Sequence, residues 1–125
     1  MTLKLNRGEI WLADLNPQIG TEPGKTRPVL IIQSQFLLDA GHPSTLIIPL
    51  TTNLIEAAWP LRVRIAKAQK LKKDSDLLID QIRAIDNSRL IQGPLTSLSD
   101  ELIQEVENAV KELLDLELKN PDRLP

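Results

Sequence analysis

The apolar residues of this chain fall into short runs separated by residues that break regular structure, and this pattern limits the fold more than any other feature. Five runs have the length of β-strands: residues 9–15, 28–34, 45–52, 61–66 and 77–85. Of the 125 residues, 42% are apolar and 26% are charged. The chain therefore has enough apolar surface for a core, and we expect one domain spanning residues 1–125.

The runs differ in their pattern. Residues 29–32 and 46–48 are continuously apolar, as is typical of central strands that are buried on both faces. Residues 61–65 alternate, which predicts that Arg62 and Arg64 face solvent while Leu61, Val63 and Ile65 face inward. We expect residues 77–85 to form a fifth strand, although polar residues interrupt it.

A helical pattern appears only near the C-terminus. Ser97 or Ser99 can cap a helix in which apolar residues recur at helical spacing between residues 102 and 114, and Asn120-Pro121 is expected to end it. Short strands followed by one amphipathic helix predict a mainly β fold with a C-terminal α-helix. In such a fold a small, strongly bent sheet or barrel packs on the helix.

Composition excludes several classes of protein. Aromatic residues make up 2% of the chain, too few for a module that stacks RNA bases on several rings. The absence of cysteine excludes disulfides and thiolate sites, and the single His42 excludes a site that needs two histidines from one chain. No apolar run approaches the ~18 residues of a membrane span, so we expect a soluble, cytoplasmic protein without membrane contact.

The net charge of −2 conceals an uneven distribution. Residues 1–99 carry 12 Lys and Arg against 9 Asp and Glu, whereas residues 100–125 carry 3 against 8. Binding to a polyanion depends on local clusters of charge rather than on the total. The net charge therefore does not exclude a nucleic-acid partner.

A glycine-rich loop precedes the second run. The segment 20–26 looks like a phosphate-binding P-loop, but its glycines are one residue too close, and a strand rather than a helix follows. The loop instead carries Lys25 and places Arg27 at the start of a central strand. Arg27 is either a functional group held by a rigid strand or an ordinary surface arginine.

Three other groups of polar residues lie at strand ends or within strands. Thr51-Thr52 closes the third run, where the hydroxyls serve local capping or position a phosphate. Gln81 and Arg83 share one face of the expected fifth strand, which faces either solvent or a groove. The acidic residues around this strand lack a recognisable metal-binding spacing and are expected to serve capping and solvation: Asp74, Asp76 and Asp80.

Several segments taken together resemble one known family. They occur in this order: Arg7-Gly8-Glu9-Ile10-Trp11, Asp14-Leu15-Asn16-Pro17, Gly20-Thr21-Glu22, Arg27-Pro28-Val29-Leu30, Pro49-Leu50-Thr51, Lys73-Asp74-Ser75, Asp80-Gln81-Ile82-Arg83 and Arg89-Leu90. The chain thereby resembles the MazF/PemK (Kid-like) family of toxin–antitoxin ribonucleases over nearly its whole length. It departs from the family at residues 33–35, where many members have an Asn, and at Asp76, where an apolar residue is common.

The resemblance implies an SH3-like small β-barrel, a homodimer, and a sequence-specific endoribonuclease that cuts single-stranded RNA (an mRNA interferase) without a metal or other cofactor. It also implies a cognate antitoxin, which we expect to bind through a disordered acidic and apolar segment. Arg27 and Thr51 match the family's catalytic positions. Four residues match positions near the RNA path: Glu22, Ser34, Gln81 and Arg83. Lys25 and Thr52 join them as expected RNA contacts.

These residue types suit RNA cleavage by the substrate's own 2′-hydroxyl, because such a site needs no protein nucleophile. Arg27 offers a planar, charged fork to phosphate oxygens, and Thr51 offers a hydroxyl. Neither is a good base, so Glu22 is the candidate proton acceptor. Two alternatives remain open: a toxin of the same fold that binds DNA gyrase without catalysis, and an SH3-like interaction module, whose aromatic groove this chain can hardly supply.

Overall fold

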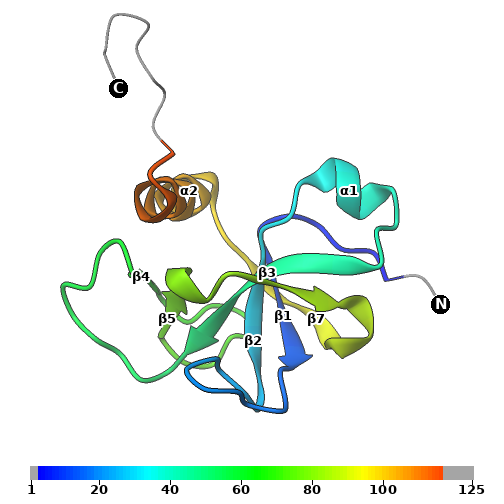
Figure 1. Cartoon of the computed structure of the whole chain (residues 1–125), viewed down its shortest axis with the longest axis horizontal. Helices are drawn as coiled ribbons and strands as arrows, with labels where there is room; N and C mark the ends of the chain where they lie inside the picture. The colour runs from blue at the N-terminus through cyan, green and yellow to red at the C-terminus, as the bar shows by residue number, and fades with distance from the viewer. Residues whose placement is uncertain (1–2, 117–125) are drawn as a thin grey trace, which may run out of the picture.

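The computed structural model describes residues 3–116, in which seven strands form one antiparallel sheet. The sheet is bent, and a helix lies beside it (Figure 1). The strands are β1 (Glu9–Asp14), β2 (Thr26–Ile31), β3 (Ser44–Thr51), β4 (Arg62–Ile65), β5 (Ser75–Leu78), β6 (Arg83–Asp86) and β7 (Leu90–Ser97). The α-helices are α1 (Gln35–Asp39) and α2 (Asp100–Leu114), and the two 3₁₀ turns are η1 (Ile79–Gln81) and η2 (Asn87–Arg89).

The sheet follows the order β4-β5-β3-β2-β1-β7, with β6 paired to β3 as well. Strand β3 is the longest central strand and has two partners along one edge. Its first half pairs with β6 and its last residues pair with β5. Within residues 3–116 the end strands β4 and β7 do not pair with each other, so the sheet is bent but not closed.

The central strands are buried on both faces, which explains their continuous apolar sequences. In β2, Leu30 belongs to one core cluster, whereas its neighbours Val29 and Ile31 belong to a second cluster on the opposite face. Ile47 and Ile48 of β3 divide between the clusters in the same way. The prediction that these two segments are central strands is confirmed.

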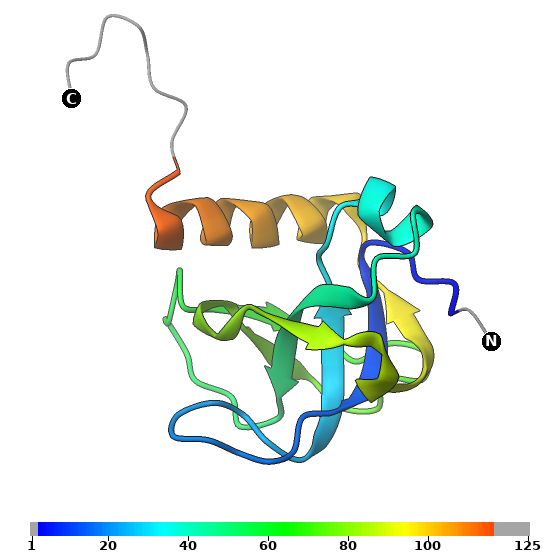
Figure 2. The same cartoon turned by 45° about the vertical axis from the view of Figure 1, so that its right-hand side comes forward.

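Helix α2 covers the first of these clusters. Its N-cap is Ser99, whose hydroxyl accepts a hydrogen bond from Leu102 N, and its side chains Val106 and Ala109 are fully buried against the sheet. Arg7 ties the helix to the start of β1 through an ion pair with Glu107 at 2.7 Å. In Figure 2 the helix lies along one end of the sheet, and the loop between β1 and β2 lies at the other. Neither helix in the described part of the chain is long and apolar enough to cross a bilayer.

The prediction of a mainly β fold with a C-terminal helix is confirmed, and the bent sheet is compatible with a small SH3-like barrel. One strand prediction is wrong. Residues 77–85 do not form a single strand, because η1 lets the chain step from β5 to β6 along the same edge of β3. Helix α1 and strand β7 were not predicted. Helix α2 ends at Leu114, while the expected stop at Asn120-Pro121 lies outside the described residues.

Candidate functional site

A cavity of about 340 Å³ opens where the start of β2 meets the end of β3. Its lining includes Lys25, Arg27, Thr51, Thr52, Asn53 and Ser75. The two strands are antiparallel with Val29 opposite Pro49, so continuing this register by two residues sets Arg27 opposite Thr51. The structure therefore brings together Arg27 and Thr51, two of the three residues expected to be catalytic, with two of the expected RNA contacts, Lys25 and Thr52.

The Arg27 guanidinium is oriented by backbone carbonyl groups. Its Nε donates to the carbonyl of Gly24 at 2.9 Å, and its Nη1 donates to the carbonyl of Leu50 at 3.2 Å. Among residues 3–116, no carboxylate lies within ion-pair distance of it. Burial accordingly lowers the pKa of Arg27, since no carboxylate partner offsets the desolvation. An oriented cation whose charge is not neutralised is suited to binding an anion.

The β1–β2 loop that delivers Arg27 has a defined shape. Lys25 adopts a left-handed conformation with φ of 67°, and its backbone N donates to Oδ1 of Asn16 at 2.7 Å. Gly24 passes close to Gln18, and a Cβ at this position would lie 2.5 Å from the Cβ of Gln18. Any larger residue would push the loop apart and move the Gly24 carbonyl that holds Arg27.

The Thr51 hydroxyl also has a fixed neighbour. Thr51 ends β3, and its Oγ1 accepts a hydrogen bond from the backbone N of Asn53 at 3.2 Å. A hydroxyl that accepts a bond keeps its own proton free to donate. The Thr51–Asn53 turn, defined as these three residues, thus presents a hydroxyl donor at the cavity wall.

Glu22 and Arg83 contact each other rather than this cavity. Glu22 Oε2 lies 3.4 Å from Arg83 Nη1, an ion pair that joins the β1–β2 loop to β6. Arg83 Nη1 is inaccessible and, among the described residues, has no well-formed hydrogen bond. Glu22 therefore reaches the cavity only if the loop moves.

The other two expected RNA contacts lie farther along the sheet. Gln81 lies in η1, which precedes β6. Ser34 lies beyond the opposite end of β2 from Arg27, where its hydroxyl caps α1 by accepting from Leu37 N at 3.4 Å. Neither residue lines the cavity, and their roles stay predictions.

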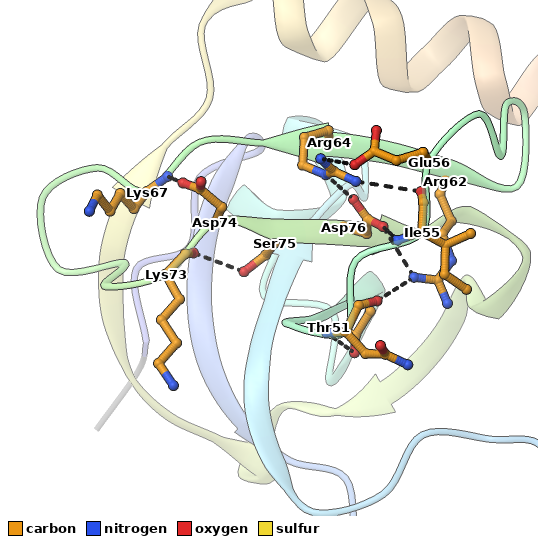
Figure 3. Close-up of polar contacts among 11 residues, drawn as sticks. Thr51, Ile55, Glu56, Arg62, Arg64, Lys67, Lys73, Asp74, Ser75 and Asp76 are labelled. Atoms are coloured by element: carbon orange, nitrogen blue, oxygen red, sulfur yellow. Dashed lines mark hydrogen bonds and ion pairs between the residues drawn. The ribbon is translucent and has the colours of Figure 1, made fainter.

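The expectation that Arg62 and Arg64 face solvent is confirmed for Arg64, which is exposed, whereas Arg62 is half-buried. Both donate to the carboxylate of Asp76, whose side chain is only 1% exposed (Figure 3). The alternating pattern identified Val63 and Ile65 correctly as buried, but the prediction that Leu61 faces inward is wrong: Leu61 precedes β4 and is 46% exposed. The pattern did not predict the acidic partner of these arginines. Asp76 lies on the neighbouring strand β5, and the pairing of β4 with β5 cannot be predicted from the alternation within residues 61–65.

Asn53 and Ser75 also line the cavity and were not predicted as site residues. Asn53 follows Thr51-Thr52 directly, so its position next to a strand end is a signal that the sequence contains. Ser75 reaches the cavity through the pairing of β5 with β3, which no local pattern reveals.

The acidic residues of this region are engaged with the protein itself. Asp74 accepts from Lys67 N at 2.8 Å, and Asp76 is held by the two arginines. Within residues 3–116 no three His, Asp or Glu side chains gather into a group that could hold a metal ion. The lining of the cavity instead includes side chains that can donate to an anion, among them Lys25, Arg27 and Thr51.

Comparison with known proteins identifies relatives of this chain. Residues 6–114 match the family described as "PemK-like, MazF-like toxin of type II toxin-antitoxin system". The chain is 42% identical over 110 residues to the endoribonuclease MazF of Staphylococcus saprophyticus subsp. saprophyticus, an alignment that covers 85% of this chain and 88% of the relative.

Solved structures share the fold at lower identity. MazF from Deinococcus radiodurans aligns with a TM-score of 0.75 at 20% identity, covering 91% of this chain and 99% of that one. The Mycobacterium tuberculosis toxin MazF-mt6 aligns with a TM-score of 0.72 at 20% identity, covering 88% and 99%. A mycobacterial endoribonuclease in complex with its cognate antitoxin aligns with a TM-score of 0.70 at 18% identity, covering 90% and 97%. With the family match spanning most of its length, this chain belongs to the PemK-like, MazF-like toxins of type II toxin–antitoxin systems.

Proposed function

We propose that this chain is an endoribonuclease toxin that cuts single-stranded RNA at specific sequences, mRNA among its substrates, without a metal ion. The observation that carries the proposal is the cavity in which Arg27 and Thr51 stand on neighbouring strands, with no described carboxylate paired to Arg27. The 42% identical relative named as an endoribonuclease supports the same activity.

The reaction we propose uses the substrate's own nucleophile. The 2′-oxygen of one nucleotide forms a bond to the adjacent phosphorus while the bond from phosphorus to the 5′-oxygen breaks. The products are a 2′,3′-cyclic phosphate and a 5′-hydroxyl, the 2′-hydroxyl proton passing to a base and the 5′-oxygen gaining a proton. The protein must hold the linkage in line and stabilise the charge that develops on the phosphoryl oxygens.

In this reaction Arg27 stabilises the phosphoryl charge and Thr51 positions the phosphoryl group. Gly24 and Leu50 hold the guanidinium through Nε and Nη1, so it faces a phosphate at the cavity without first having to reorganise. The Thr51 hydroxyl, which accepts from Asn53 N, donates its proton to a phosphoryl oxygen and so positions the group. Both interactions strengthen as negative charge builds up, which lowers the barrier rather than only tightening substrate binding.

Glu22 takes up the 2′-hydroxyl proton in this proposal. In the described conformation its carboxylate pairs with Arg83 at 3.4 Å, so the β1–β2 loop must move before Glu22 acts. The RNA phosphate that enters the site then replaces Glu22 as the anion beside Arg83. This exchange frees the base at the moment when the substrate binds.

The remaining contacts follow the RNA beyond the cleaved linkage. Lys25 and Thr52 line the same cavity and bind flanking phosphates. Gln81 and Arg83 continue the path along η1 and β6. Ser34 lies at the far end of β2, so it contacts only RNA that extends past the cavity.

We also propose that the active form is a homodimer that binds a cognate antitoxin. A relative with the same fold has been solved in complex with its cognate antitoxin. A disordered segment with acidic and apolar residues fits the basic cavity, because its carboxylates replace RNA phosphates beside Arg27. RNA and antitoxin then compete for one groove shared by two copies of the chain.

Incubation of the purified protein with a mixed RNA pool in excess EDTA tests the activity. We expect discrete fragments on a gel, with cyclic phosphates at their 3′ ends by mass spectrometry. Cleavage that appears only after Mg²⁺ is added would contradict the metal-independent reaction. No cleavage under any condition would favour a toxin that acts by binding alone.

A further inference from the structure

A nearly buried carboxylate supports the Thr51–Asn53 turn from outside the cavity. We propose that Asp76 of β5 is a positioning residue for the Thr51 hydroxyl and that it acts through Arg62. The inference rests on the proposed function, because orientation of this hydroxyl affects activity only if the hydroxyl contacts the reacting phosphate. Figure 3 shows Asp76 between the two arginines of β4, with Thr51 on the neighbouring strand.

Asp76 is occupied on both carboxylate oxygens. Oδ1 accepts from Arg64 Nε, and Oδ2 accepts from Ile55 N at 3.0 Å and from Arg62 Nη1 at 3.1 Å. A carboxylate with 1% of its side chain exposed is costly to desolvate. An apolar side chain at this position would fill the space without that cost, so the role of Asp76 lies in its polar contacts.

Arg62 links this carboxylate to the turn. One nitrogen, Nη1, donates both to Asp76 Oδ2 and to the backbone carbonyl of Asn53 at 2.7 Å. The backbone N of Asn53 in turn donates to Thr51 Oγ1. Asp76 thus fixes Arg62, Arg62 fixes Asn53, and Asn53 supplies the bond that orients the Thr51 hydroxyl.

The strands keep these groups in register. Thr51 pairs with Asp76 across β3 and β5, and Asp76 pairs with Arg64 across β5 and β4. The Thr51 backbone is therefore fixed by the sheet. What remains variable is the turn after it, which Asp76 holds through Arg62 at the Asn53 carbonyl, while its own bond from Ile55 N fixes the chain just beyond the turn.

Arg64 offers a matched control within the same network. It contacts Asp76 Oδ1, Glu56 and the carbonyl of Ile55, none of which belongs to the Thr51–Asn53 turn. Removing Arg64 weakens the ion-pair network, whereas removing Arg62 weakens the network and also releases the turn. The difference between the two variants isolates the positioning effect.

The experiment compares Arg62→Gln and Arg64→Gln, each alone and combined with Thr51→Ala, by kcat and KM on one RNA oligonucleotide. We expect Arg62→Gln to lower kcat by about tenfold with KM little changed, because misplacement of a reacting group lowers the rate of the chemical step. Arg64→Gln is expected to keep the wild-type kcat. In the Thr51→Ala background, Arg62→Gln is expected to cause no further loss, since the hydroxyl that it positions is absent.

Three outcomes would overturn the proposal: an unchanged kcat for Arg62→Gln, an equal loss for Arg64→Gln, or an undiminished effect of Arg62→Gln in the Thr51→Ala background. A Thr51→Ala variant that cuts at the wild-type rate would instead contradict the proposed role of Thr51 itself. If Arg62→Gln does not fold, Arg62→Lys replaces it. Lysine keeps the positive charge beside Asp76, but its side chain is one bond shorter and lacks the Nη1 atom that contacts both Asp76 Oδ2 and the Asn53 carbonyl, so the same loss of kcat is expected.

Discussion

Replacing Arg27 with alanine is the most informative single change in this protein. The substitution removes two side-chain hydrogen bonds, to the carbonyls of Gly24 and Leu50. Each contributes about 0.5–1 kcal/mol to stability at a partly exposed site. The loss of about 1–2 kcal/mol is small against the 5–15 kcal/mol that is typical of natural domains, so the variant is expected to fold.

The expected effect on catalysis is larger. Removing a preorganised donor from developing negative charge costs about 3 kcal/mol at the transition state, which is on the order of a hundredfold in kcat. Arg27→Lys keeps the charge but has no second nitrogen with which to donate to the phosphate. We therefore expect its kcat to be about tenfold higher than that of Arg27→Ala and still below that of the wild type. Single-turnover cleavage of an end-labelled RNA measures these rates.

Arg89→Ala is the matched control. Arg89 also donates to two backbone carbonyls, those of Asp14 and Asn16, at the base of the same β1–β2 loop. If Arg27 acted only by holding the loop, both variants would lose activity equally. Cleavage near the wild-type rate by a folded Arg27→Ala variant, or an equal loss in Arg89→Ala, would refute its role at the phosphate.

Three further predictions concern Glu22, Asp76 and the antitoxin. Glu22→Gln is expected to lower kcat by about a hundredfold, because the amide cannot accept the 2′-hydroxyl proton; an unchanged rate would leave Glu22 with only its ion pair to Arg83. Burial raises the pKa of Asp76, but hydrogen bonds from Arg64, Ile55 and Arg62 outweigh it and hold this pKa below the ordinary 3.8. The stability that Asp76 contributes is therefore present above about pH 4 and lost as pH falls through its lowered pKa. Urea unfolding should show wild-type protein and Asp76→Asn differing by about 2–3 kcal/mol at pH 7, with the difference shrinking as pH falls below about 4; a difference that does not shrink on acidification would contradict this assignment. Antitoxin peptide is expected to displace a labelled non-cleavable RNA from the protein, and RNA that stays bound at saturating peptide would exclude a shared groove.

The sequence predicted the features of this molecule that depend on local pattern. Continuous apolar runs identified β2 and β3, and the capping serine with its helical spacing identified α2. The loop that carries Lys25 and the strand start at Arg27 followed from the density of glycine and proline. The pairing of Arg27 with Thr51 came from the family resemblance, and the register of β2 against β3 supplies its geometric basis.

The features that were missed depend on contacts between distant strands. The break at η1 cannot be predicted from residues 77–85 alone. It depends on tertiary pairing, because β5 and β6 both pair with the same edge of β3 and the chain must shift along that edge between them. The burial of Asp76 likewise depends on the alignment of β4 with β5, which places Arg62 and Arg64 around it. Strand β7 was missed because its sequence lacks a strong apolar alternation; it packs Gly93 so closely on Trp11 that a Cβ there would lie 2.3 Å from the ring.

In the proposed reaction the RNA supplies its own nucleophile in a cavity organised by Arg27 and Thr51. The most direct test uses an oligonucleotide that the protein cuts at one position, compared with the same molecule carrying 2′-deoxyribose at that position alone. Both are incubated with the protein in excess EDTA, and the products are identified by mass spectrometry. We expect a 2′,3′-cyclic phosphate from the natural RNA and an intact 2′-deoxy oligonucleotide that still binds. Cleavage of the 2′-deoxy oligonucleotide at that position would show that the 2′-hydroxyl is not the nucleophile.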